Sequence, residues 1–365
     1  MDFDALRLKY SGDPVKLDEI LQQECRERYA SKFRDTLRSG SFRFPSRAVA
    51  EMATSDEVAQ FHASLIDGDR SVLDMTFGLG IDAFHIARSG AEVECCEIDA
   101  HNAEVGRLNA SGLDNVAVNH VDSIEFVNSY DGRFETIFVD PARRDSKGRH
   151  FSLDDCEPRI LPYLDTILSK CYRLIVKCSP MLDVTALRTE LGGEADIYAV
   201  GTRRECKELL AVVPGRGLTH AVTIGQGQIT FAPSQEAEAA TDYIDTPRGY
   251  LYEPYSAVMK AAPFKLLCSL YGVKKLGQHT HLYCSEEVVA DFPGERLEII
   301  ETLDFNKRTM TDVARRYGMI NVAVRNFPLS APELARRLKV KEGGELRLFG
   351  ATLGSGRKVL IITRP

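Results

Sequence analysis

The chain has 365 residues, of which 44% are hydrophobic and 27% charged. This composition is ordinary for a globular protein and too apolar for a disordered one. The net charge of −7 argues against a protein that merely coats nucleic acid. Its nine cysteines form no CxxC pair and show no zinc-like spacing with histidine. We therefore expect two or three domains, reduced thiols in a cytoplasm and no metal site.

The first residues, MDFDALRLKY, contain no basic segment followed by an apolar one. The sequence also lacks a run of about 18 apolar residues, the length that a membrane span needs. We expect neither secretion nor contact with a membrane.

Charge is distributed unevenly along the chain. Residues 291–365 contain 14 Lys/Arg and 9 Asp/Glu, a net charge of +5, so the other 290 residues carry −12. An uneven surface would produce this pattern, and so would a terminal module that docks on phosphates.

The spacing of apolar residues predicts helices over 14–39 and 48–66. Thereafter short apolar runs alternate with helical stretches, which predicts right-handed βαβ units and a parallel, doubly wound sheet. The last runs, ADIYAVG, KELLAVVP and AVTIG, have no helices between them, so that edge should contain an antiparallel hairpin.

The remaining sequence predicts small α+β units. Residues 233–242 are polar and read as a linker, FPGE at 292–295 reads as a turn, and Ser330 and Glu333 have the spacing of a helix capping box. We expect an N-terminal helical region (1–66), a doubly wound domain (67–232), a small α+β domain (243–292) and a basic α+β domain (293–365).

The most informative stretch is LDMTFGLGIDAF, at the first strand–helix junction. Gly78 and Gly80 let the backbone approach a ligand closely, and a helix N-terminus follows them. Glu97 ends the second strand 19 residues after Gly78, where a carboxylate can accept hydrogen bonds from ribose hydroxyls. GLGIDA also fits the dinucleotide fingerprint, so an NAD(P)-dependent oxidoreductase is one candidate. Asp74, however, suits an ammonium group and would repel a pyrophosphate.

Taken together, LDMTFGLG, CCEID, HVD and VDPARR resemble the successive motifs of class I S-adenosylmethionine-dependent methyltransferases, over about residues 71–225. The resemblance implies a Rossmann-like, seven-stranded methyltransferase sheet with S-adenosyl-L-methionine as cofactor. It places Asp140 at the mouth where methyl transfer occurs. The cofactor-binding residues expected from it are Asp74, Thr76, Phe77, Gly78, Gly80, Glu97, Ile98, Asp122, Ser123 and Asp140.

The acceptor motif is Asp140-Pro141-Ala142-Arg143-Arg144. Methyltransferases that act on amines usually carry Asn/Asp-Pro-Pro-Tyr/Phe here, and this sequence lacks the second proline and the aromatic residue. Asp140 is a candidate to orient the acceptor or accept its proton. Arg143 and Arg144 are candidates to stack on a base or hold a phosphate.

Cys178 ends the next strand, in Lys177-Cys178-Ser179-Pro180. A DP-x-R motif also occurs in RNA carbon-5 methyltransferases, whose next strand ends in a nucleophilic cysteine. Cys178 is therefore either a nucleophile or a small buried apolar group.

Further segments, VDPARRD, KCSPMLD, RRECKELL, YLYEPYSAVMKAAPF, THLYCSE and FPGER, resemble a bacterial methyltransferase family with a ferredoxin-like domain followed by a THUMP-like domain. This implies an RNA target, tRNA or rRNA, because THUMP domains bind RNA. Independently of it, the last unit carries basic residues that can face phosphates: Arg315, Arg316, Arg336, Arg337, Lys339, Lys341, Arg357 and Lys358. A non-catalytic RNA-binding or assembly factor with a degenerate pocket is the remaining alternative.

Overall fold

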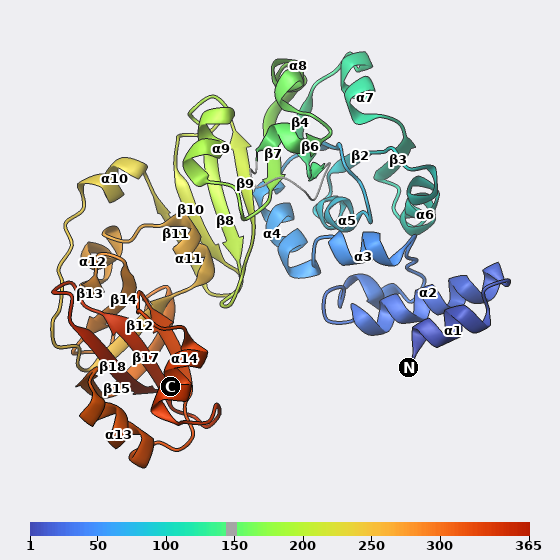
Figure 1. Cartoon of the computed structure of the whole chain (residues 1–365). Helices are drawn as coiled ribbons and strands as arrows, with labels where there is room; N and C mark the ends of the chain where they lie inside the picture. Colours follow the sequence, from blue (N-terminus) through green and yellow to red (C-terminus); the bar gives the residue numbers. More distant parts are fainter. Residues whose placement is uncertain (144–151) are drawn as a thin grey trace. The chain divides into compact units, whose positions relative to one another are not determined.

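The computed structural model describes residues 1–143 and 152–365. The chain divides into two compact units, the first made of Met1–Ile197 and Glu208–Gly217, the second of Tyr198–Lys207 and Leu218–Pro365. The division passes through two strands, β8 (Asp196–Gly201) and β9 (Cys206–Val213). Figure 1 labels the elements in chain order.

The first unit is built on a sheet whose strands follow the order β9-β7-β4-β1-β2-β3. All neighbours are parallel except β7 and β9, which are antiparallel. They belong to a nine-stranded sheet, which has two strands more than the seven expected. The bounds of the others are β1 Ser71–Asp74, β2 Glu92–Glu97, β3 Val116–His120, β4 Phe134–Val139 and β7 Cys171–Cys178, and a two-stranded ribbon pairs β5 Ala142–Arg143 with β6 Cys156–Glu157.

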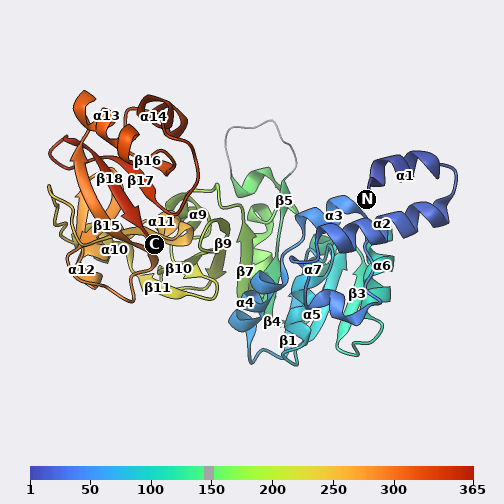
Figure 2. The ribbon, with the colours of Figure 1, turned by 90° about the horizontal axis from the view of Figure 1, so that it is seen from below.

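Helices connect these strands and precede the first of them. Figure 2 shows the first two helices side by side. The helices of this unit are α1 Phe3–Lys9, α2 Pro14–Arg28, α3 Arg47–Met52, α4 Asp56–Ile66, α5 Ile81–Ala87, α6 Ala100–Ala110, α7 Ser123–Ser129, α8 Leu164–Ser169 and α9 Val184–Glu190, with 3-10 turns at Thr36–Ser39, Leu153–Asp155 and Leu161–Tyr163.

Both helices predicted before the first strand are shorter in the structure than the spacing of apolar residues suggested. The helix predicted over 14–39 ends at Arg28, because the chain turns at Tyr29 and thereby places Phe33 against Phe44, with ring centroids 5.9 Å apart. The helix predicted over 48–66 is two helices. Between them Ser55 is extended, and the Thr54 hydroxyl bonds to Asp82, so tertiary contacts break the local pattern.

The second unit contains two groups of strands. The first, in the order β11-β10-β8, includes the antiparallel hairpin of β10 (Thr219–Thr223) and β11 (Gly227–Phe231), as expected at this edge. The second group is a seven-stranded sheet in the order β13-β14-β12-β15-β18-β17-β16. Its strands are β12 Tyr250–Pro254, β13 Lys274–Gly277, β14 Thr280–Ser285, β15 Gly294–Asp304, β16 Asn321–Arg325, β17 Arg347–Thr352 and β18 Lys358–Arg364, and the helices are α10 Pro233–Glu238, α11 Ser256–Ala261, α12 Leu266–Tyr271, α13 Lys307–Arg316 and α14 Ala331–Leu338.

The seven-stranded sheet joins the strands of both predicted C-terminal domains. Antiparallel pairing of β12 with β15 sets Leu251 opposite Leu297, and both side chains belong to one core with Phe349. The capping box of α14 is confirmed, since the Ser330 amide donates to Glu333 at 2.9 Å. In the part of the chain that the structure describes, no helix is long and apolar enough to span a membrane.

Candidate active site

Three acids lie at the carboxyl ends of neighbouring strands in the first unit. β1 ends at Asp74, β2 ends at Glu97, and Asp140 follows β4. Because β1 pairs in parallel with both β2 and β4, these three ends meet at one edge of the sheet. This is the edge where open α/β sheets bind ligands.

The loop between β1 and α5 has a backbone that favours glycine. Gly78 and Gly80 have φ angles of 56° and 79°, in the left-handed region that other residues rarely adopt. At Gly80 a Cβ would also lie 2.4 Å from the Phe77 ring. The loop is tied to the neighbouring strand, since the Asp140 amide donates to the Thr76 hydroxyl at 2.7 Å.

Glu97 braces this loop from the end of β2. One carboxylate oxygen accepts from the Gly78 amide at 2.9 Å, and the other accepts from the Asp99 amide at 2.8 Å. Ile98, the next residue, is 69% exposed. A ligand in front of the loop would therefore meet a carboxylate that the backbone holds in place.

Two of the expected cofactor residues have other contacts. Phe77 is buried, and its ring fills the space beside Gly80 and Gly106, so its side chain supports the loop from within the core. Asp122 caps α7, accepting from the amides of Ile124 at 2.8 Å and Glu125 at 3.1 Å. Ser123, the first residue of that helix, is buried.

Asp74 is a buried acid whose pKa lies well above the ordinary value for a carboxyl group. Its side chain is almost completely enclosed and accepts a hydrogen bond from the Thr76 amide at 2.9 Å. Burial raises the pKa of Asp74 to about 8, and the nearby carboxylates of Asp82, Asp140 and Glu97 act in the same direction. Without a cationic partner, Asp74 is therefore mostly protonated at neutral pH.

The charge at the carboxyl edge of the sheet suits S-adenosylmethionine better than a dinucleotide. Asp74, Glu97 and Asp140 are acidic, and the amides of Gly78 and Asp99 already bond to Glu97. A ligand with an ammonium and a sulfonium group would compensate the carboxylates, whereas a pyrophosphate would be repelled by them. The residues present fit S-adenosylmethionine, which Asp74, the Gly78–Gly80 loop and Glu97 could hold.

Asp140 forms an ion pair with Lys177 of β7. The Lys177 ammonium lies 2.5 Å from the Asp140 carboxylate and donates to the Thr54 hydroxyl at 2.9 Å. Burial raises the pKa of Asp140, and Lys177 opposes that rise. Burial alone would lower the pKa of Lys177, but the surrounding carboxylates, Asp140 first among them, hold it above its ordinary value.

A buried histidine continues this network. Thr54 donates to Asp82 at 2.6 Å, and Asp82 lies 2.7 Å from the His62 ring. The other ring nitrogen of His62 contacts the buried carboxylate of Glu208 on β9. Burial by itself would lower the pKa of His62, but the carboxylates of Glu208 and Asp82 raise it to about 10. Asp82, in turn, has a pKa lowered to about 2, because His62 and Lys177 outweigh its burial.

Sequence reasoning did not find this network. His62 and Glu208 are 146 residues apart, and although Glu208 lies in the RRECKELL segment, no sequence pattern links it to His62. Alternation along β7 offered one signal, since it turns Lys177 and Cys178 to opposite faces. Nearby, Glu205 and Lys207 form an ion pair with each other, while Glu208 instead faces His62.

The remaining residues predicted to act on the acceptor are Arg143, Arg144 and Cys178. The backbone of Arg143 pairs with Cys156, and Arg144 lies outside the described residues. Cys178 is buried, and burial raises the pKa of its thiol well above the ordinary value. These surroundings disfavour a thiolate nucleophile.

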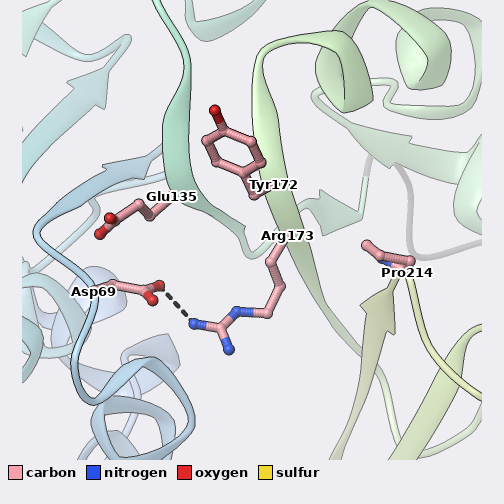
Figure 3. Close-up of a pocket in the computed structure, with 5 residues that line it drawn as sticks. All are labelled: Asp69, Glu135, Tyr172, Arg173 and Pro214. Atoms are coloured by element: carbon pink, nitrogen blue, oxygen red, sulfur yellow. Dashed lines mark hydrogen bonds and ion pairs between the residues drawn. The ribbon is translucent and has the colours of Figure 1, made fainter.

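A separate hollow lies at the opposite, amino-terminal edge of the first unit's sheet. This cavity of about 450 Å³ is lined by Asp69, Glu135, Tyr172, Arg173 and Pro214 (Figure 3). Arg173 is held there by Asp69 at 2.5 Å. Since it contains none of the strand-end acids, it is distinct from the candidate site. No cluster of three or more His, Cys, Asp or Glu in the described ranges is arranged to hold a metal ion.

Comparisons with known proteins found two domain models and several similar chains. A ferredoxin-like domain model matches residues 250–293, and a THUMP domain-like model matches residues 294–365. An uncharacterized S-adenosylmethionine-dependent methyltransferase of Mycobacterium tuberculosis, found in strains H37Rv and CDC 1551, is 25% identical over 318 residues, 84% of either chain. The crystal structure of a protein from Porphyromonas gingivalis W83, designated a methyltransferase, superposes with a TM-score of 0.88 at 26% identity, covering 100% of this chain and 94% of that one.

The fold, the acidic strand ends and these relatives together define an S-adenosylmethionine-dependent methyltransferase. Within that class, the C-terminal part of the chain is similar to a ferredoxin-like domain followed by a THUMP domain-like one. The cofactor is S-adenosylmethionine, and the NAD(P)-dependent oxidoreductase considered from the sequence is set aside.

Proposed function

We propose that this methyltransferase modifies a base in structured RNA, either tRNA or rRNA. The observation that carries the proposal is the THUMP domain-like match at residues 294–365, which coincides with the basic part of the chain. Positive charge concentrated in one module is the expected footprint of phosphate binding.

Two helices of this module support the proposal. Val313 of α13 and Leu334 and Leu338 of α14 belong to one buried core, so the two helices turn their apolar sides to the same sheet. Their exposed residues are strongly basic: Lys307, Arg308, Arg315 and Arg316 on α13, Arg336 and Arg337 on α14, and Lys339 and Lys341 just after it. Arg315 and Arg316 also pair with Asp312, so we prefer Arg336 and Arg337 of α14 to these two as phosphate ligands.

At the candidate active site we assign a role to each strand-end acid. Asp74 faces the ammonium of the methionine moiety, the Gly78–Gly80 loop allows close approach of the backbone, and Glu97 accepts from the ribose. Thr76, Ile98, Asp122 and Ser123 complete the expected wall, with Ile98 offering apolar contact. When bound, S-adenosylmethionine supplies a methyl carbon that its sulfonium already activates.

Asp140 is our candidate for positioning the acceptor. A carboxylate accepts hydrogen bonds, so it suits an acceptor nitrogen or oxygen that carries hydrogen. It would orient the lone pair of that atom and receive the proton released on methylation. Arg143 and Arg144, three and four residues further along the chain, remain candidates to hold the RNA. The buried thiol of Cys178 does not favour the carbon-5 route.

Mass spectrometry of tRNA and rRNA nucleosides from a deletion strain tests the proposal. We expect one methylated nucleoside to disappear and to return when the wild-type gene is supplied. An Asp140→Asn gene, expressed at the same level, should not restore it. An unchanged nucleoside profile would overturn the RNA assignment, and full restoration by Asp140→Asn would favour a non-catalytic RNA-binding or assembly factor. We place the enzyme in the cytoplasm, in keeping with nine cysteines that form no disulfide bond.

A further inference from the structure

The candidate acceptor site receives groups from four different parts of the first unit. Asp140 follows β4, Lys177 lies on β7 and Asp82 on α5, whereas Thr54 lies between α3 and α4 in the N-terminal helical region. The Lys177 ammonium contacts both Asp140 and Thr54, and Thr54 in turn donates to Asp82. The N-terminal region therefore contributes directly to the site instead of merely covering it.

The geometry points to Lys177 as a positioning residue for methyl transfer, which holds Asp140 ionised and oriented toward the acceptor and is itself fixed by Thr54. This inference rests on the proposed role of Asp140, but not on RNA being the acceptor. It adds to the acceptor motif a lysine from the next strand and a hydroxyl from the N-terminal region.

The burial of the pair supports this role. The Lys177 side chain is 11% exposed, whereas that of Asp140 is 39% exposed, so the acid reaches solvent and the lysine stands behind it. In an ordinary surface ion pair, the lysine would be the more exposed of the two side chains. Because an ammonium ion is donor-only, Lys177 can take no proton from the acceptor while it remains charged.

The charges around Asp140 explain why the lysine is needed. The carboxylates of Asp82 and Glu208 disfavour a negative charge on Asp140, while His62 contacts both of these carboxylates. Among the side chains that the structure describes, Lys177 is the cation paired with Asp140. If it were neutral, the pKa of Asp140 would rise further, and less of the acid would be ionised near neutral pH.

A labelled-methyl assay with the full-length chain tests the inference. Extract from a deletion strain receives S-adenosylmethionine with a labelled methyl group, and incorporation is followed from pH 5.5 to 9 for wild type and variants. We expect Lys177→Met to lose at least 10-fold in rate near neutral pH and to shift the acidic limb of the profile to higher pH. Lys177→Arg should restore part of the rate, because it keeps the charge.

Thr54 offers a gentler variant that keeps the buried charges in place. Thr54→Val removes the hydroxyl that accepts from Lys177 and should lower the rate several-fold, whereas Thr54→Ser keeps it and should stay close to wild type. Lys207→Met is the matched control, since Lys207 lies on the adjacent strand β9 in an exposed ion pair with Glu205. Binding of S-adenosylhomocysteine verifies that every variant is folded.

The outcomes separate this inference from the RNA assignment. If Lys177→Met and Thr54→Val match Lys207→Met in rate and pH profile, the positioning role is overturned. If ribonuclease treatment of the extract leaves the incorporated label unchanged, RNA is not the acceptor, although the variants still test Lys177. A rate loss with an unshifted profile, unrelieved by Lys177→Arg, would show a purely structural lysine and would also overturn the inference.

Discussion

Lys177 and Asp140 face each other from the ends of neighbouring parallel strands, with the lysine nitrogen 2.5 Å from a carboxylate oxygen. Neighbouring strand ends in a parallel sheet bring such groups together although they are 37 residues apart in sequence. The ion pair therefore combines the acceptor motif on one strand with a charge that the motif does not contain.

Replacing Asp140 with asparagine should abolish most methyl transfer while leaving the fold intact. The side chain is 39% exposed, so we expect a small stability change. Loss of a group that orients the acceptor and receives its proton should cost about 100-fold or more in rate. Asp131→Asn, at an exposed position before β4, is the control and should retain activity. Equal single-turnover rates for the two variants would contradict the role of Asp140.

Gly80→Ala should disturb the loop that follows β1. The added Cβ would lie 2.4 Å from the Phe77 ring, at a residue whose φ is 79°. We expect a loss of roughly 1–3 kcal/mol in the free energy of unfolding, together with weaker binding of S-adenosylhomocysteine. Gly112→Ala meets nothing within 4 Å and has no left-handed φ, so it should behave like wild type. Urea unfolding and calorimetry measure both effects.

Cofactor binding should release a proton from Asp74. Its pKa of about 8 in the ligand-free protein keeps it mostly protonated at pH 7, and an ammonium group would favour the carboxylate. Affinity for S-adenosylmethionine should therefore rise with pH up to about 8 and then level off, by at most about tenfold per pH unit. Calorimetry in buffers of different ionisation enthalpy would detect the proton. Asp74→Asn should bind weakly and with little dependence on pH.

His62 should stabilise the protein most below its unfolded pKa. The folded pKa of about 10 lies above the ordinary value of 6.5. Its contribution is therefore fully present below about pH 6.5 and is lost as pH rises toward 10. His62→Gln leaves Asp82 and Glu208 without their cation and should cost about 3–5 kcal/mol at pH 6. The exposed His101→Gln should cost little. A His62→Gln loss that is the same at pH 6 and pH 9.5 would exclude this pairing.

Reversing charge on α14 should weaken RNA binding. Arg336→Glu with Arg337→Glu changes two exposed residues. We expect a tenfold or greater loss of affinity for tRNA or rRNA fragments, and a less steep dependence of affinity on salt by about one unit for each phosphate that is no longer neutralised. Lys9→Glu with Lys16→Glu alters net charge equally on the N-terminal helices and should leave binding nearly unchanged. Filter binding at several salt concentrations would distinguish the two pairs.

The sequence was sufficient to predict the strand-end acids, and tertiary contacts account for what it did not predict. Asp74, Glu97 and Asp140 each end an apolar run, and parallel pairing brings such ends to one edge. By contrast, Glu208 reaches His62 only because β9 enters the sheet antiparallel to β7. No local pattern encodes that contact. The break at Thr54 likewise follows from its bond to Asp82, which outweighs the helical spacing around it.

The pairing of β12 with β15 has a consequence for how the C-terminal half folds. Residues 250–293 and 294–365 match two different domain models, yet they share a sheet and a core. A fragment ending at residue 293 would leave one whole side of β12 without its hydrogen-bonding partner and would uncover Leu251. Open edges of this kind invite aggregation. The two matched segments should therefore unfold in a single step. We also expect them to occur together in related proteins.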